Sequence, residues 1–187
     1  ASTGRNQRVV LFGGQGFHYP RMGSVFWLEH PEFQFWIRQF SQWTQEDRGL
    51  DLLDFLYGKD SEEERFQSKL SWTHPANFAF NFSVAKVLEV EGITPDILMG
   101  YSQGELVALT LAGGVEVREA FRFVNDTAAI LEGRVLDGGM VAVVGSSSLM
   151  SRFSKEFEGL SLACVNHGEH FVVAGTDGRL EALIRNL

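Results

Sequence analysis

The sequence predicts an α/β fold with a parallel sheet and flanking helices, followed by a smaller lobe. Short apolar runs alternate with longer segments of helical spacing, and this alternation is typical of a parallel sheet with helices on both faces. One apolar run leads through a glycine-flanked serine, Ser102, directly into a helix. After residue 139 the order becomes strand, helix, strand, strand, helix, which is typical of a ferredoxin-like lobe that lacks its last strand. We therefore expect a large lobe over residues 1–137 and a small lobe over residues 138–187.

The first predicted elements lie before residue 75. Residues 8–12 are expected to form a short buried strand that runs into the glycine-rich segment 13–16. Aromatic and aliphatic residues recur at helical spacing over residues 32–40 and predict a helix there. Residues 41–74 are polar and predicted to be irregular, except for a charged helix over residues 61–69 that begins with a serine N-cap.

Helices and one strand are predicted over the rest of the large lobe. Pro75 suits the first position of a helix, which is expected to run to about residue 91. The apolar run 97–99 predicts a strand, with one helix after Ser102 and another over residues 116–133. The small lobe is predicted to contain a strand over 140–144, a helix over 147–157, strands over 160–165 and 171–174, and a helix from residue 177.

Composition limits the partners and the compartment. With 44% hydrophobic residues, including 16 Phe and 4 Trp, the chain can build a core rich in aromatic rings. The net charge of −8 argues against nucleic acid as a partner. The single cysteine, Cys164, is interpreted as a buried strand residue, so no internal disulfide and a reducing, cytoplasmic location are expected. The sequence contains no apolar run of membrane-spanning length, so no membrane association is expected.

The most informative motif is Gly100–Glu105, which reads Gly-Tyr-Ser-Gln-Gly-Glu. It fits the Gly-x-Ser-x-Gly pattern of a nucleophile elbow, in which a tight strand-to-helix turn exposes a serine hydroxyl. The helix that follows directs backbone N–H groups and the positive end of its dipole toward the same point. Ser102 is therefore predicted to be a nucleophile that attacks an acyl group.

Four further motifs accompany this elbow. They are Phe12–Gly16, Thr73–Ala76, Gly139–Val143 and Asn166–Gly175. Together with the elbow, and in the same order, they resemble motifs of the acyl-carrier-protein acyltransferases. This family includes malonyl-CoA:ACP transacylases and the acyltransferase domains of polyketide synthases. The resemblance extends from end to end of the chain, and it implies the same architecture that the pattern of elements predicts.

The resemblance implies a two-step reaction in polyketide or fatty-acid biosynthesis. Ser102 would take an acyl group from acyl-CoA or another thioester and pass it to the phosphopantetheine thiol of an acyl carrier protein. The backbone N–H groups of Gln15 and Gln103 would form the oxyanion hole. Substrate-binding roles are expected for Tyr101, Thr127, His74, His170 and Asn166. No bound cofactor and no metal ion are expected.

The general base is the first departure from the family pattern. The resemblance implies a histidine well downstream of the small lobe, but the sequence ends at Leu187. We expect the chain to be a piece of a longer protein with the base beyond residue 187; the alternatives are a base on another chain or a different base. Among the histidines present, His18 is a candidate for the pocket mouth. His74 ranks ahead of His167 and His170 as a substitute base.

The second departure concerns the acyl group. Malonyl-type members of the family carry an arginine at the position of Thr127, and its guanidinium pairs with the free carboxylate of the substrate. Thr127 offers no cation, and burying an unpaired carboxylate is costly. Tyr101 replaces a histidine of the family and alters the wall nearest the acyl group. An uncharged acyl group, either acetyl or a longer monocarboxylic chain, is therefore expected.

Other functions stay open on the sequence alone. An acyl hydrolase of the same fold would clear acyl groups from carrier proteins, and it too would need no arginine at position 127. A non-catalytic module that has lost its base would dock a carrier protein. A generic serine esterase is a weaker alternative, because it would leave the Gly-Gln-Gly segment and the small lobe unexplained.

Overall fold

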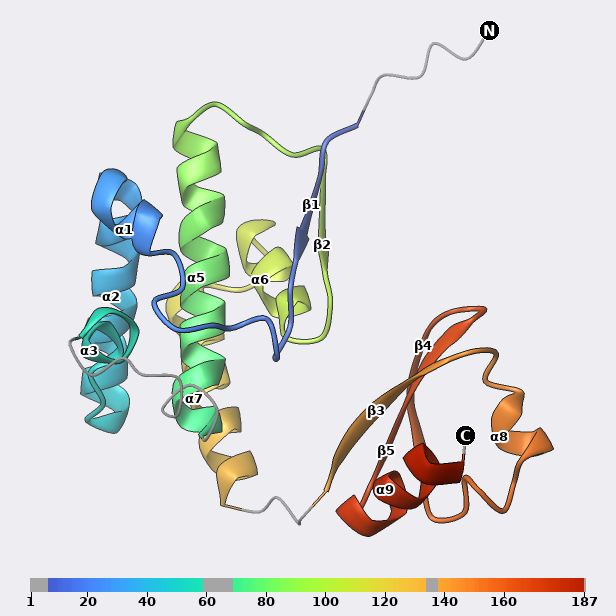
Figure 1. Ribbon diagram of the computed structural model, residues 1–187. Coiled ribbons are helices and arrows are strands. Elements are labelled where there is room, and N and C mark those ends of the chain that lie inside the picture. The colour runs from blue at the N-terminus through green and yellow to red at the C-terminus, as the bar shows by residue number, and fades with distance from the viewer. Residues whose placement is uncertain (1–6, 59–68, 134–137, 187) are drawn as a thin grey trace, which may run out of the picture. The chain divides into compact units, whose positions relative to one another are not determined.

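The computed structural model describes residues 7–58, 69–133 and 138–186, which fall into two compact units. The first unit extends to Gly133 and the second follows it (Figure 1). The predicted division after residue 137 falls at residues 134–137, which lie outside the described residues. The charged helix predicted over residues 61–69 also lies outside them, apart from Lys69.

The first unit combines a pair of strands with a layer of helices. Its elements are β1 (Val9–Phe12), α1 (Ser24–Glu29), α2 (Pro31–Arg48), α3 (Leu52–Tyr57), α5 (Leu70–Val90), β2 (Ile97–Gly100), α6 (Gly104–Leu111) and α7 (Val117–Glu132). Figure 1 shows α5 in the middle of this unit, with α1, α2 and α3 on one side and β1, β2 and α6 on the other. The predicted strands over 8–12 and 97–99 and the predicted helix over 116–133 are confirmed.

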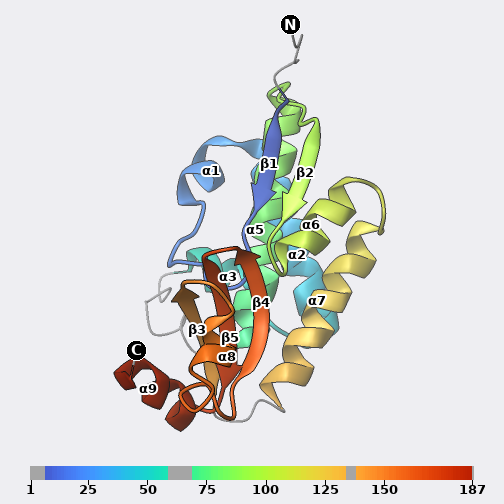
Figure 2. The same ribbon diagram turned by 90° about the vertical axis from the view of Figure 1, so that its right-hand side faces the viewer.

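The two strands of the first unit are parallel, as predicted. Val10 pairs with Leu98 and Phe12 with Gly100, and the side chains of this inner face pack against the helices. The outer face carries four apolar residues that are 38–65% exposed, namely Val9, Leu11, Ile97 and Met99. In Figure 2 this face is turned toward the viewer, with α5 behind it. The expectation of helices on both faces is therefore wrong for the described residues, whose helices cover one face only.

Helix α2 is longer than the sequence pattern predicted. It continues to Arg48, so residues 41–48 are helical rather than irregular. The buried face continues beyond Phe40 through two small polar residues, Ser41 and Thr44. Hydrogen bonds satisfy both hydroxyls: Thr44 donates to the Phe40 carbonyl and Ser41 to the Asp51 carboxylate. A search for apolar spacing misses such a face, because its buried positions are polar.

Helix α5 begins at Leu70, so the prediction that it starts at Pro75 is wrong. Pro75 lies inside the helix and is buried there. A proline inside a helix removes one backbone hydrogen bond. Here α5 packs against α2, α3, α6 and α7, and the burial gained by these contacts outweighs that loss.

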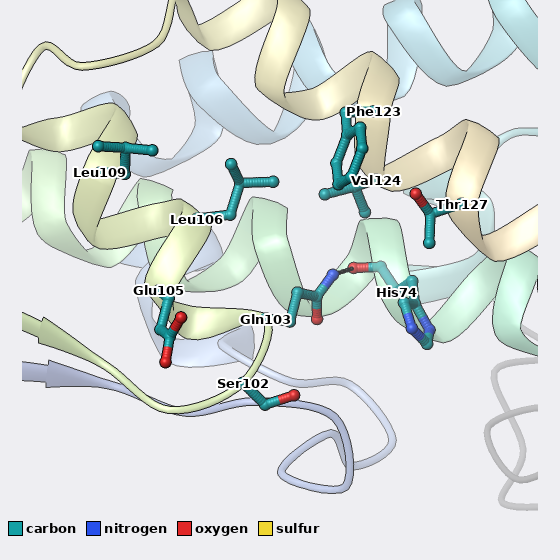
Figure 3. A pocket seen from close by; sticks show the side chains of 9 residues that line it. All are labelled: His74, Ser102, Gln103, Glu105, Leu106, Leu109, Phe123, Val124 and Thr127. Atoms are coloured by element: carbon teal, nitrogen blue, oxygen red, sulfur yellow. Dashed lines mark hydrogen bonds between the residues drawn. The ribbon is translucent and has the colours of Figure 1, made fainter.

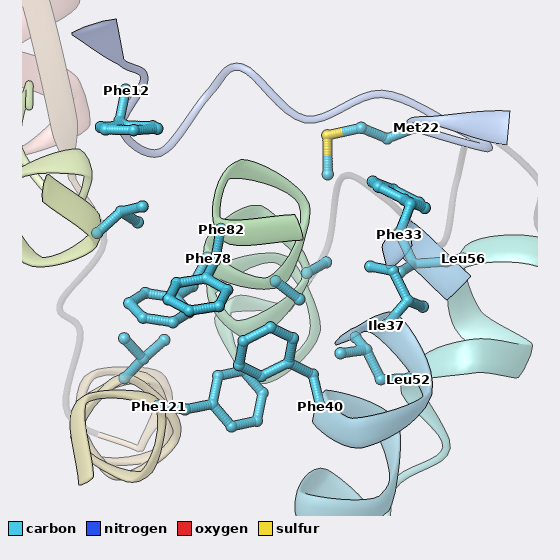
Figure 4. Close-up of a cluster of buried hydrophobic side chains, with 14 of the residues drawn as sticks. Phe12, Met22, Phe33, Ile37, Phe40, Leu52, Leu56, Phe78, Phe82 and Phe121 are labelled. Atoms are coloured by element: carbon cyan, nitrogen blue, oxygen red, sulfur yellow. The ribbon is translucent and has the colours of Figure 1, made fainter. Parts of the chain in front are cut away.

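The core of the first unit consists largely of stacked and tilted rings, which confirms the composition-based prediction. Phe40 lies at the centre, with ring centroids of Phe78, Phe82 and Phe121 between 4.6 and 5.8 Å away (Figure 4). The rings of Phe78 and Phe82 meet that of Phe40 almost edge to face, at 83° and 85°. Each such pair contributes about 0.5–1.5 kcal/mol beyond its buried area. These contacts bind α2, α5 and α7 into a rigid support for the strand ends.

The second unit is a three-stranded antiparallel sheet with two helices. Its elements are β3 (Gly139–Val144), α8 (Leu149–Arg152), β4 (Ser161–His167), β5 (His170–Gly175) and α9 (Asp177–Asn186). The strand order is β3-β5-β4, which fits the predicted ferredoxin-like pattern. The helix predicted over 147–157 is wrong beyond α8, because successive hydrogen-bonded turns replace it around Phe157. Cys164 is half-buried rather than buried, and it forms no disulfide.

Candidate active site

Ser102 lies at the turn between β2 and α6 with a left-handed backbone, φ 54°. For a residue with a side chain this conformation costs about 1–2 kcal/mol. Two backbone hydrogen bonds close the turn, from the Gly104 N–H to the Tyr101 carbonyl at 2.9 Å and from the Glu105 N–H to the Ser102 carbonyl at 3.0 Å. The serine itself is exposed. The turn therefore has the strained backbone and the accessible side chain that the elbow motif predicts.

The glycine-rich segment after β1 lies directly against this turn. A Cβ added to Gly14 would come within 2.7 Å of the Tyr101 carbonyl oxygen and 2.9 Å of the Ser102 Cβ. Any side chain at position 14 would therefore push the two segments apart. On the other side of the turn, a Cβ added to Gly104 would lie 2.2 Å from the Phe12 carbonyl oxygen. The end of β1 and the elbow consequently form one closely packed unit.

Two backbone N–H groups are free to bind a substrate beside Ser102. Among the residues that the structure describes, neither the Gln15 N–H nor the Gln103 N–H has a hydrogen-bond acceptor. The next three N–H groups of the turn and of α6, those of Gly104, Glu105 and Leu106, are all occupied. The N–H groups around the serine that have no acceptor in the described part of the chain therefore include the two that the family resemblance assigns to an oxyanion hole, and that role stays a prediction.

A pocket of about 370 Å³ opens between the elbow, α5, α6 and α7 (Figure 3). Its lining residues are His74, Ser102, Gln103, Glu105, Leu106, Leu109, Phe123, Val124 and Thr127. The structure thus brings three residues predicted from sequence, His74, Gln103 and Thr127, together with Ser102. Most of the exposed lining is apolar, and the described lining residues include no lysine or arginine.

His74 is neutral under physiological conditions. Burial, with the nearby His18 as a smaller contribution, lowers the pKa of His74 from its ordinary value of 6.5. Its Nδ1 atom is buried and has no hydrogen-bond partner among the described residues. A neutral imidazole at this position can accept or donate one hydrogen bond to a ligand, but it provides no positive charge.

We expect His74→Gln to weaken the dependence of stability on pH. The folded protein binds the His74 proton less readily than the unfolded chain does, so wild-type stability falls as the pH drops below about 6.5. Glutamine removes this contribution, and the loss of unfolding free energy between pH 7 and pH 5 should be smaller in the variant. Denaturant titrations at several pH values measure the difference. Equal losses for variant and wild type would contradict the assignment.

Three other predicted site residues are not among those that line this pocket within the first unit. Tyr101 precedes the serine and is 42% exposed, but it is not among the nine lining residues. Asn166 and His170 belong to the second unit, where the Asn166 side-chain nitrogen lies 3.1 Å from His170 Nδ1. The two residues are therefore adjacent to each other, and their substrate-binding role stays a prediction, as does that of Tyr101.

Several residues at the site were not singled out from the sequence. Leu106 and Leu109 lie one turn apart on α6, and Phe123 projects from α7 into the same pocket (Figure 3). The sequence pattern predicted the helices that carry them but gave no role to these three side chains. Asn77 on α5 is also new, since it contacts both segments around the serine.

The described residues form neither a metal cluster nor a membrane-spanning helix. Within residues 7–58, 69–133 and 138–186, no three side chains of the metal-binding types are grouped closely enough to hold an ion. No helix of the described part of the chain is long and apolar enough to cross a membrane.

The sequence matches the family model of the acyl transferase domain over residues 9–187. It is 33% identical over 165 residues to the polyketide biosynthesis protein ThaF of Burkholderia thailandensis. The aligned region covers 88% of this chain and 14% of ThaF. It is also 25% identical over 179 residues to PksD of Bacillus subtilis, a polyketide biosynthesis acyltransferase homolog. This alignment covers 96% of this chain and 55% of PksD. The chain thus spans about half of PksD and a smaller part of ThaF.

A solved structure agrees with the sequence relatives. The acyl transferase domain of ZmaA superposes with a TM-score of 0.84 at 26% identity, and the match covers 99% of this chain and 44% of that one. The elbow, the glycine-rich segment and the small antiparallel sheet all lie within this match.

Proposed function

Since this chain belongs to the acyl transferase domain family, we propose that it moves an uncharged acyl group from a thioester, through an acyl-serine at Ser102, to an acyl carrier protein. The observation that carries the proposal is the position of Ser102. Ser102 is exposed and lines an apolar pocket, next to two segments whose backbone N–H groups at Gln15 and Gln103 have no acceptor in the described part of the chain. Acyl transfer needs this combination of a nucleophile and oriented donors.

In the first half-reaction the Ser102 oxygen attacks the thioester carbonyl carbon. A C–O bond forms while the serine proton passes to a general base, and the carbonyl oxygen becomes an oxyanion that accepts from the Gln15 and Gln103 N–H groups. The C–S bond then breaks, and CoA or another thiol leaves with a proton. One donor of this kind is typically worth about 2.7–4 kcal/mol.

In the second half-reaction the phosphopantetheine thiol of a carrier protein attacks the acyl-serine. The new C–S bond forms, the C–O bond breaks, and the Ser102 hydroxyl regains its proton. The Ser102 side chain has no hydrogen-bond partner among the described residues. No base is therefore assigned among the described residues, and the family resemblance implies a histidine for this step.

The lining of the pocket supports an uncharged acyl group. Leu106, Leu109 and Phe123 form apolar walls, and Thr127 and the neutral His74 supply hydrogen bonds without charge. Glu105, the one carboxylate among the described lining residues, would repel a substrate carboxylate. A malonyl group would have to bury its charge here without a cationic partner, which is unfavourable.

We expect Thr127→Arg to shift the selectivity toward malonyl-CoA. A guanidinium at this position would pair with the free carboxylate, and charge-assisted pairs of this kind are worth about 1.5–3 kcal/mol. The ratio of malonyl to acetyl acylation should therefore rise at least ~10-fold. Intact mass spectrometry after competition between the two acyl-CoA donors measures this ratio.

Ile130→Arg is the matched control for this variant. Ile130 lies on the same helix, is 56% exposed and does not line the pocket, so its substitution adds the same charge to the surface. We expect the acyl ratio of this control to equal that of the wild type. An equal increase in both variants would show that general charge, rather than position 127, sets the preference.

The function itself is tested with the full-length protein, acetyl-CoA and a carrier protein in its phosphopantetheine form. The expected result is a wild-type adduct on Ser102, followed by transfer of the acyl group to the carrier. Release of free acid without transfer would support hydrolysis instead. Absence of any acyl-enzyme with a series of acyl chain lengths would contradict the proposal.

A further inference from the structure

Three polar residues on α5 contact three successive residues of the glycine-rich segment. The Gln15 side-chain nitrogen donates to Thr73 Oγ1 at 2.7 Å, and the Asn77 side-chain nitrogen donates to the Gly14 carbonyl at 2.8 Å. The Asn81 side-chain nitrogen donates to the Gly13 carbonyl at 3.4 Å. We call Thr73, Asn77 and Asn81 the α5 polar stripe.

The spacing of the stripe explains why these contacts form together. Residues four apart lie above one another on a helix, so the three side chains share one face of α5. The glycine-rich segment runs along this face in the opposite direction, with residue 15 beside Thr73 and residue 13 beside Asn81. Two members of the stripe, Thr73 and Asn77, are buried, and apart from Ser83 the other buried residues of α5 are apolar.

Asn77 is the centre of the stripe and also reaches the elbow. Its side-chain nitrogen donates a second hydrogen bond, at 2.9 Å, to the side-chain oxygen of Gln103. The Gln103 side-chain nitrogen donates in turn to the His74 carbonyl at 2.7 Å. Asn81 donates to the Asn77 side-chain oxygen at 3.2 Å, which fixes the orientation of the Asn77 amide. Asn77 is only 1% exposed, so water does not compete for these bonds.

The contact with Gly14 also orients the neighbouring N–H group. The Gly14 carbonyl and the Gln15 N–H belong to the same peptide unit, and in a trans peptide these two groups point in opposite directions. Because Asn77 holds the carbonyl toward α5, the Gln15 N–H is directed away from α5. The Gln15 N–H has no acceptor among the described residues, as this orientation requires.

We propose that Asn77 is a positioning residue that sets the relative placement of the two oxyanion-hole donors, through Gly14 on one side and Gln103 on the other. The inference rests on the proposed roles of Ser102, Gln15 and Gln103, but not on the identity of the acyl donor. Asn77 itself does not touch the substrate: it has no place in the pocket lining. Its side-chain nitrogen donates one hydrogen bond to the glycine-rich segment and one to the elbow. A residue without these donor hydrogens would lose both hydrogen bonds.

Asn77→Asp is the sharpest test, because it keeps the shape of the side chain and removes its donor hydrogens. The introduced carboxylate would face two acceptors, the Gly14 carbonyl and the Gln103 side-chain oxygen. The readout is the reaction of Ser102 in the full-length protein with a fluorophosphonate probe. In this reaction an O–P bond forms at the serine, fluoride leaves, and the oxyanion hole binds the phosphoryl oxygen. We expect the rate constant of inactivation to fall about 10- to 100-fold, somewhat less than on deletion of a donor, with the probe affinity within about twofold.

The pH profile separates this role from a purely structural one. Burial raises the pKa of a carboxyl group, so part of the introduced carboxyl is protonated at lower pH and regains one donor. The rate constant for labelling of Ser102 in Asn77→Asp, divided by that of the wild type, should therefore increase as the pH falls from 8 to 6. The titratable side chains of the pocket, His74 and Glu105, are present in both proteins, so the ratio cancels their effect.

Asn125→Asp is the matched control. Asn125 is 2% exposed on α7, and its side-chain nitrogen donates within its own helix, to the Phe121 carbonyl. We expect Asn125→Asp to lower the melting temperature while leaving the labelling rate within about threefold of wild type. Gln103→Leu is a second variant in case Asn77→Asp does not fold. It keeps the Gln103 N–H but removes the link to Asn77, and it should slow labelling about 5- to 30-fold.

The outcomes distinguish the two proposals. Wild-type labelling rates in Asn77→Asp, or equal slowing in Asn125→Asp at equal stability, would overturn the positioning role. Labelling of wild-type Ser102 without acyl transfer from any thioester would refute the proposed function while leaving the role of Asn77 supported. If the probe never labels wild-type Ser102, both are wrong.

Discussion

Ser102→Ala is expected to abolish acyl-enzyme formation. The variant lacks the oxygen that forms the ester, and loss of a serine nucleophile costs on the order of 10⁶-fold in turnover. Intact mass spectrometry after incubation with acyl-CoA should detect no adduct. Ser83→Ala is the matched control, since the Ser83 hydroxyl is buried with no hydrogen-bond partner among the described residues, and its removal should leave acylation unchanged. A persistent adduct on Ser102→Ala would show that another residue is the nucleophile.

Ser102→Gly should be equally inactive but more stable than the wild type. The backbone φ of 54° is unfavourable for serine and unstrained for glycine. Relief of about 1–2 kcal/mol is partly offset by the greater freedom of glycine in the unfolded chain, so we expect a net gain of up to about 1 kcal/mol. Denaturant unfolding of the alanine and glycine variants separates the lost chemistry from the relieved strain. A glycine variant less stable than the alanine variant would contradict this account.

Gly104→Ala is expected to be a severely damaging methyl addition at the site. The new Cβ would lie 2.2 Å from the Phe12 carbonyl oxygen, and both atoms belong to the closely packed junction of β1 and α6. Neither can move without displacing the elbow, so we expect a loss of about 3 kcal/mol or more in stability, together with loss of acylation. Thermal unfolding followed by circular dichroism measures the stability.

Gly133→Ala provides the comparison within the same unit. The nearest atom to its added Cβ is 3.6 Å away, and its φ of −82° is ordinary for alanine. The unfolding free energy of this variant should be within about 0.5 kcal/mol of that of the wild type. If Gly104→Ala and Gly133→Ala are equally stable, the elbow can accommodate an added methyl group and the expected loss of stability is wrong.

Much of the fold follows from local pattern. Continuous apolar runs identified β1 and β2, and helical spacing identified α7 with a boundary set by Glu116, whose side chain accepts from two N–H groups at the helix start. The second unit was also predictable in outline, since its strands alternate with turn residues. These elements are determined by residues that lie next to one another in the sequence.

The errors have a common physical cause. Ser41 and Thr44 are polar but buried, so the buried face of their segment lacks the apolar spacing from which a helix was predicted. Pro75 is a helix-starting residue by its local preference, yet tertiary packing places it inside α5. The exposed outer face of β1 and β2 could not be read from their apolar sequences, because such runs are typical of strands buried on both faces.

The site shows the same division. The sequence indicated Ser102, and it named Gln15 and Gln103 through a family resemblance. It gave no indication that Asn77 connects them, because asparagine and glutamine at these positions form bonds across 26 or more residues of sequence. Such long-range polar contacts produce no periodic pattern in the sequence. The elbow, in contrast, is a local turn that its flanking glycines identify.

The backbone of Ser102 also limits which side chain can act there. A threonine hydroxyl has similar chemistry, but a β-branched residue is a severe outlier at positive φ. Cysteine has an unbranched Cβ and would meet no such barrier. The backbone conformation at this turn therefore disfavours threonine as the nucleophile and is compatible with serine or cysteine, independently of their chemical reactivity.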